Sequence, residues 1–160
     1  MNRENSAKFL NPTNLEGIWW VATALVLTIL LLPIYANVPN FQFYGFNALF
    51  ILVFVTYTRY VFLLKYTWFA KMMWVKVVLS LICPLLILMM VDGIHQFQLF
   101  MDEKGIDVLM KDVPLQKWDS FYQYIRAEYL LFGVGSVIIA VILPIRMIIS
   151  VWRYRNEGTI

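Results

Sequence analysis

Each of four long apolar stretches of this sequence has one charged residue set back from its end. These residues are Glu16, Arg59, Lys76 and Arg146, and each lies roughly one to two helical turns from one end of its stretch. Charges are costly in lipid unless they pair or reach the headgroups. The basic side chains could therefore extend back to the headgroups, or Glu16 could pair with the cations in a buried polar layer. Three cations beside one acid also suggest contact with an anionic lipid head group or a phosphate.

The single histidine, His95, follows Asp92 at a spacing of three residues, which places the two on one face of a helix. Two such ligands form only one edge of a metal site, because typical sites need three or four. A quinone site would instead group His95 and Asp92 with Glu128 and nearby aromatic residues. We predict no metal site and no cofactor, and we keep Asp92 and His95 as an alternative quinone or metal contact.

A stripe of large apolar residues lies in the segment before the last apolar stretch. Trp118, Phe121, Tyr122 and Ile125 follow the spacing of one helical face. Such a face could rest on the membrane surface or on a neighbouring helix of the same chain. It could equally dock a partner protein, since Trp, Tyr and Phe dominate the energetics of interfaces. The sequence leaves both alternatives open.

The elements that carry these residues are four apolar runs, at 15–36, 46–66, 69–91 and 129–152. A helix needs about 20 apolar residues to cross about 30 Å of hydrocarbon. The chain is 61% hydrophobic and only 14% charged, whereas soluble domains carry about a quarter charged residues. The runs are apolar on all faces, which favours helices over strands of a barrel. We predict an all-α integral membrane protein in which residues 1–160 form a single domain with four transmembrane helices.

The segment between the last two runs, 92–128, predicts an extramembrane helical hairpin that extends spans three and four. Helical character continues past Asp92 to Glu103, and Gly105 is a plausible stop. The run from Leu115 to Glu128 is again compatible with a helix. About 12 further residues in each arm would project roughly 18 Å beyond the membrane.

The charges between the runs predict an orientation. Basic residues gather in both tails and around the second turn, near Trp68, whereas the 92–128 segment is rich in acids. The basic residues concerned are Arg3, Lys8, Arg59, Lys65, Lys71, Lys76, Arg146, Arg153 and Arg155. Cytoplasmic loops carry an excess of lysine and arginine. We therefore expect both termini in the cytoplasm of a bacterial-type inner membrane, and the 92–128 segment outside.

No motif in the sequence indicates catalysis. There is no GxSxG, HExxH or CxxC pattern, no glycine-rich phosphate loop and no acid in the middle of an apolar run. We expect a non-catalytic small inner-membrane subunit, an accessory or assembly partner of a larger complex, in contact with lipid and other membrane subunits but not with nucleic acid. One alternative is a small homo-oligomeric channel or carrier whose cation layer attracts anions. Another is a quinone-binding redox subunit.

Overall fold

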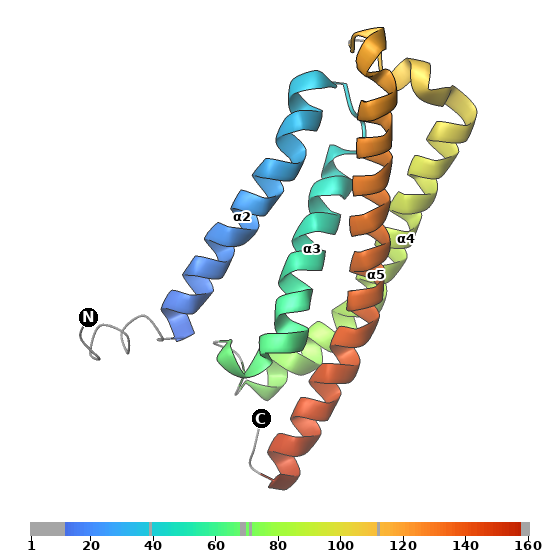
Figure 1. The fold of residues 1–160 in the computed structure, drawn as a ribbon. Coiled ribbons are helices and arrows are strands. Elements are labelled where there is room, and N and C mark those ends of the chain that lie inside the picture. Colours follow the sequence, from blue (N-terminus) through green and yellow to red (C-terminus); the bar gives the residue numbers. More distant parts are fainter. Residues whose placement is uncertain (1–11, 39, 68–69, 71, 112, 158–160) are drawn as a thin grey trace, which may run out of the picture.

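The computed structural model of the chain describes residues 12–38, 40–67, 70, 72–111 and 113–157. Over these residues the protein is 91% helical and contains no strand. The elements are α2 (Pro12–Asn37), α3 (Tyr44–Leu63), α4 (Met73–Leu109) and α5 (Trp118–Glu157), with 3-10 turns η1 (Leu64–Tyr66) and η2 (Leu115–Lys117) (Figure 1). Arg3, Lys8, Trp68 and Lys71, which contribute to the predicted orientation, lie outside the described residues.

The four helices are each long and apolar enough to cross a membrane, which confirms the predicted all-α, four-span architecture at that level. The prolines Pro33, Pro84 and Pro144 lie inside α2, α4 and α5, and each helix continues through its proline. The helices begin or end a few residues away from the predicted spans. The fourth predicted span, 129–152, is the central part of a longer helix, because α5 already begins at Trp118.

Helices α4 and α5 are longer than a membrane requires. They contain 37 and 40 residues, so α5 alone is about 60 Å long, twice the thickness of the hydrocarbon. Gly105, at φ 70° and ψ 179°, interrupts α4 at the predicted stop, and helical turns resume as far as Leu109. A positive φ favours glycine, which lacks a Cβ. The location of this excess length outside the membrane, as a hairpin, stays a prediction.

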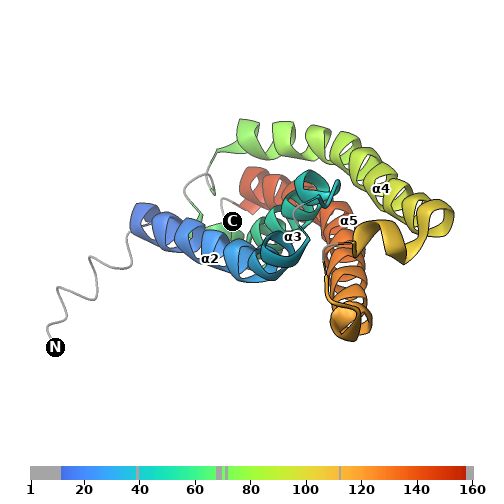
Figure 2. The same ribbon diagram turned by 90° about the horizontal axis from the view of Figure 1, so that it is seen from above.

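The helices form an open arrangement with α5 at its centre. α5 packs against both α3 and α4, whereas α2 packs chiefly against α3. Seen from above, α2 and α4 lie on opposite sides of the α3–α5 pair (Figure 2). The start of α2, the end of α3, the start of α4 and the end of α5 share one end of the molecule, which we call the terminal end (Figure 1). The opposite end, where α4 turns back into α5, is the hairpin end.

An aromatic cluster fixes the helices at the hairpin end. Phe41 and Phe43, in the segment between α2 and α3, are buried against Phe97 of α4 and Tyr129 of α5. The Tyr129 ring stacks on Phe97 with centroids 4.1 Å apart, and its hydroxyl donates to the carbonyl oxygen of Gly93 at 3.0 Å. Such ring pairs add about 0.5–1.5 kcal/mol each beyond their buried area. The cluster therefore joins α3, α4 and α5 where they are furthest from the termini.

Candidate functional site

At the terminal end, α2 and α3 are joined by a buried ion pair. Arg59 Nη2 of α3 donates to Glu16 Oε2 of α2, and both side chains are largely excluded from solvent. The Arg59 guanidinium also lies 5.5 Å from the centre of the Trp19 ring and 5.7 Å from that of Tyr60, within the range of cation–π attraction. This arrangement neutralises Arg59 inside the chain and holds its planar side chain in place.

At the same end, Lys76 of α4 faces α5 without an acid. Its side chain is 1% exposed, and Nζ donates to Ser150 Oγ at 2.9 Å. Over the described part of the chain, the single ion pair is the one between Arg59 and Glu16. Lys76 therefore carries a buried positive charge that a neutral hydroxyl solvates and no carboxylate balances.

Arg146 of α5 contacts the end of α3. Its Nε donates to the carbonyl oxygen of Val61 at 3.2 Å, in the last turn of that helix. Carbonyl groups in the last turn lack helical partners, and the partial negative charge there favours a cation. Arg146 also lies near enough to Lys76 for the two positive charges to interact. The structure thus brings Glu16 to Arg59 and Lys76 to Arg146, in two separate groups rather than one continuous layer.

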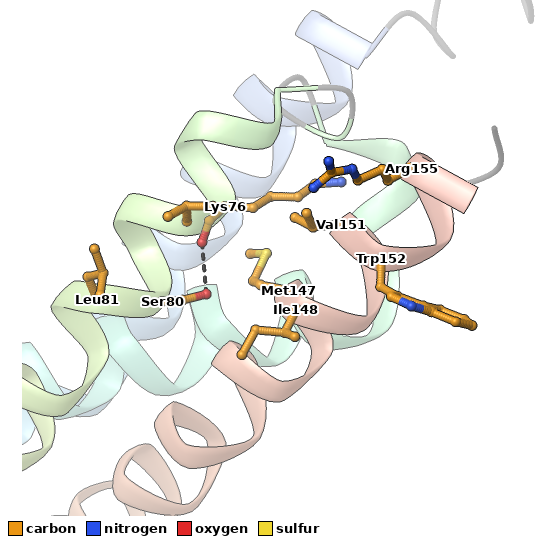
Figure 3. A pocket seen from close by; sticks show the side chains of 9 residues that line it. Lys76, Ser80, Leu81, Met147, Ile148, Val151, Trp152 and Arg155 are labelled. Atoms are coloured by element: carbon orange, nitrogen blue, oxygen red, sulfur yellow. Dashed lines mark hydrogen bonds between the residues drawn. The ribbon is translucent and has the colours of Figure 1, made fainter. Parts of the chain in front are cut away.

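A cavity of 390 Å³ opens between α4 and α5 beside Lys76 (Figure 3). We call it the α4–α5 groove. It is lined by Lys76, Val77, Ser80, Leu81, Met147, Ile148, Val151, Trp152 and Arg155. In Figure 3 the Lys76 side chain extends from α4 towards α5, on the side where Arg155 lies. The Ser80 hydroxyl donates to the Lys76 carbonyl oxygen at 2.8 Å, so its hydrogen bond lies within α4. The groove is basic at the terminal end and apolar further along.

The structure buries a polar pair at the hairpin end that we did not predict. Asn47 Nδ2 of α3 donates to Glu128 Oε2 of α5 at 2.6 Å, and the two residues are 0% and 5% exposed. Asn47 Oδ1 and Glu128 Oε1 are buried without a hydrogen-bond partner. A protonated carboxyl group can both accept from an amide and donate to it. A neutral Glu128 would therefore suit this site better than a carboxylate.

The helical spacing of the sequence could have indicated that Glu128 is buried. Glu128 follows buried Ile125 by three residues and precedes buried Tyr129, so it lies on the core-facing side of α5. The sequence alone places Glu128 at the end of the acidic 92–128 segment and in the alternative quinone site with Asp92 and His95. We had not singled out Asn47, which lies in the first turn of α3.

Asp92 and His95 lie on the exposed side of α4. Asp92 Oδ2 accepts a hydrogen bond from Gln96 Nε2 at 2.7 Å. Asp92 and His95 line one shallow hollow on that helix, whereas Gln96 lines a different one beside Phe43 and Phe46. Glu128 is buried against Asn47 and does not join them. Within the described residues, no three His, Cys, Asp or Glu side chains come together as metal ligands. A quinone or metal contact at Asp92 and His95 stays a prediction.

The predicted docking stripe is partly buried within the protein. Ile125 is 0% exposed, and the side chains of Trp118, Phe121 and Tyr122 are half-buried against the core. The Trp118 indole donates to the Val113 carbonyl oxygen at 2.7 Å. Ile125 has no surface to offer a partner in this conformation, because it is fully buried in the hydrophobic core. Internal packing, the alternative left open by the sequence, accounts for Ile125, whereas docking of a partner at the half-buried Trp118, Phe121 and Tyr122 stays a prediction.

No family model, curated protein or solved structure matches this chain. Its function is therefore inferred from its own residues.

Proposed function

We propose that the protein is a small, non-catalytic membrane subunit that assembles with other membrane proteins. The observation that supports this is the weak attachment of α2. Only 11% of its most apolar stretch is buried within the chain, compared with 44% in α3, 17% in α4 and 33% in the last span. α2 contacts chiefly α3, at one edge of the arrangement.

Apolar exposure alone does not require a protein partner, since lipid covers apolar side chains well. Helix association in membranes depends instead on close packing and interhelical hydrogen bonds. Among the described residues, the polar contacts of α2 include the Glu16–Arg59 ion pair and the bond from the Tyr124 hydroxyl to the Leu30 carbonyl oxygen at 2.9 Å. A helix from another subunit could pack against the outer face of α2 without displacing either contact.

That outer face is broad and continuous. Large apolar side chains on it are more than half exposed at Ile18, Val21, Leu25, Ile29, Leu32 and Tyr35. They recur at intervals of three to four residues, which places them in one row along the helix. We propose that this row is the assembly surface.

The proposed location follows from charge. The described residues place Lys65, Arg153 and Arg155 at the terminal end, and Asp102, Glu103 and Asp107 at or near the hairpin end. Lysine and arginine are enriched on the cytoplasmic side of membrane proteins. We propose a bacterial-type inner membrane with the terminal end in the cytoplasm.

Site-specific photo-crosslinking tests the assembly surface. A photoreactive residue at Val21 or Ile29 of α2, which are 61% and 67% exposed, should capture one defined foreign membrane protein. The same probe at Leu88 of α4, which is 69% exposed, is the matched control and should capture lipid. The captured protein should also co-purify in stoichiometric amount in mild detergent. Lipid adducts at all three positions would refute the proposal, and cross-links between copies of this chain would favour the homo-oligomeric alternative.

A further inference from the structure

We propose that the α4–α5 groove binds one anionic phospholipid, with its phosphate at the terminal end and an acyl chain along the apolar wall. This inference rests on the membrane insertion proposed above, but not on any partner subunit. The contacts that support it are the unbalanced charge of Lys76, the second cation at Arg155 and the order of polar and apolar residues along the groove.

Lys76 places its amino group in the wall of the groove, although its side chain is only 1% exposed. An ammonium group has three N–H donors, and the described contacts of Lys76 occupy one of them, at Ser150. Burying a charge is costly unless an opposite charge compensates for it. Arg146, which is close to Lys76, adds to the positive potential instead of reducing it. An anion in the groove would compensate both.

Arg155 offers the direct contact. Its side chain is exposed and lines the groove at the terminal end (Figure 3). Guanidinium groups bind phosphate oxygens through two parallel hydrogen bonds. Among the described lining residues there is no acid to compete for it or to repel a phosphate.

The rest of the groove suits an acyl chain. From Arg155, the lining residues of α5 run through Trp152 and Val151 to Ile148, a distance of about 10 Å along the helix. Leu81 of α4 and Ile148 of α5 are 73% and 61% exposed, so they present apolar surface along this path. Trp152 lies between the basic and apolar parts, and tryptophan favours the level of the headgroups. This polarity matches a lipid that lies parallel to the helices, whereas free phosphate would use only the basic end.

Native mass spectrometry of the purified protein tests the proposal, without partner subunits. The protein in detergent should retain one molecule of phosphatidylglycerol in preference to phosphatidylcholine. Each basic residue near an anionic headgroup contributes about 1 kcal/mol, which is about fivefold in affinity. Arg155→Gln should therefore weaken phosphatidylglycerol binding about fivefold, and Lys76→Met with Arg155→Gln about thirtyfold. Arg153→Gln is the matched control, because Arg153 is exposed nearby but does not line the groove, and it should change binding less than twofold.

A steric variant separates a lipid from a free phosphate. Ile148→Trp fills the apolar part of the groove and leaves both cations in place, so it should abolish phosphatidylglycerol binding. Because Ile148 is exposed, the fold should tolerate this change, and an unchanged melting curve would verify that. Equal retention of the two lipids, loss of affinity as large in Arg153→Gln as in Arg155→Gln, or displacement of the lipid by millimolar inorganic phosphate would each overturn the proposal.

Discussion

Two helix contacts at the terminal end each bury one basic side chain, and they differ in how its charge is balanced. Between α2 and α3, Arg59 meets the carboxylate of Glu16. Between α4 and α5, Lys76 meets the hydroxyl of Ser150 and lies near the positive Arg146. In the first contact, the charges of Arg59 and Glu16 cancel within the chain. In the second contact, no carboxylate among the described residues balances the charge of Lys76.

This difference in charge balance suggests that the Glu16–Arg59 contact is structural, whereas the region of Lys76 is a binding surface. A buried ion pair is expensive to break, because the partner that remains is an uncompensated charge. Arg59 therefore has a structural role, because its ion pair holds α2 against α3. Lys76 has no such partner, and the cavity beside it gives an external anion access to the same region. The weakly packed α2 needs its ion pair, whereas α4 and α5 are held by extensive packing along their length.

The largest effect on stability should come from breaking the Glu16–Arg59 ion pair. Glu16→Ala leaves Arg59 buried without its carboxylate, so we expect the free energy of unfolding to fall by about 3–5 kcal/mol. Thermal unfolding in detergent measures this. The double variant Glu16→Met with Arg59→Met removes both charges and should recover most of the loss. A change of less than about 1 kcal/mol in Glu16→Ala would show that the pair behaves like an exposed one.

We expect an intermediate effect at the hairpin end, where Asn47 and Glu128 form a third buried polar contact between helices. Glu128→Ala leaves the Asn47 amide buried without an acceptor, at a cost of about 1–3 kcal/mol. Glu128→Gln keeps the shape and an acceptor oxygen, so we expect it to cost less than about 1 kcal/mol. Both variants can be compared by chemical unfolding in detergent. Equal losses in the two variants would mean that the negative charge of Glu128 is required, in contrast to the neutral carboxyl inferred from its surroundings.

The smallest effect should come from removing the unbalanced cation. Removing a buried charge that no opposite charge compensates also removes the cost of taking that charge out of water. We therefore expect Lys76→Met to change the stability of the lipid-free protein by less than about 1 kcal/mol. Ser150→Ala is the control for the lost hydrogen bond. A loss as large as that of Glu16→Ala would remove the contrast between the two contacts, because it would mean that Lys76 is already compensated inside the protein.

The sequence by itself determined the elements of this protein. Hydropathy identified four helices, and Gly105 marked the break in α4, because both signals depend on residues close together in the chain. The sequence also identified Glu16, Arg59, Lys76 and Arg146 as the charged residues to explain. Their similar distances from the helix ends were enough for that.

Only the tertiary structure decided the partners of these residues. The neighbours Glu16–Arg59, Asn47–Glu128 and Lys76–Ser150 are 43, 81 and 74 residues apart. Which of them meet depends on α5 lying between α3 and α4 while α2 stays at the edge, and no local pattern encodes that order. The same order buried Ile125 of the predicted docking stripe and Glu128. Helical periodicity shows which residues share a face, but the face that becomes interior is set by which helices pack against it.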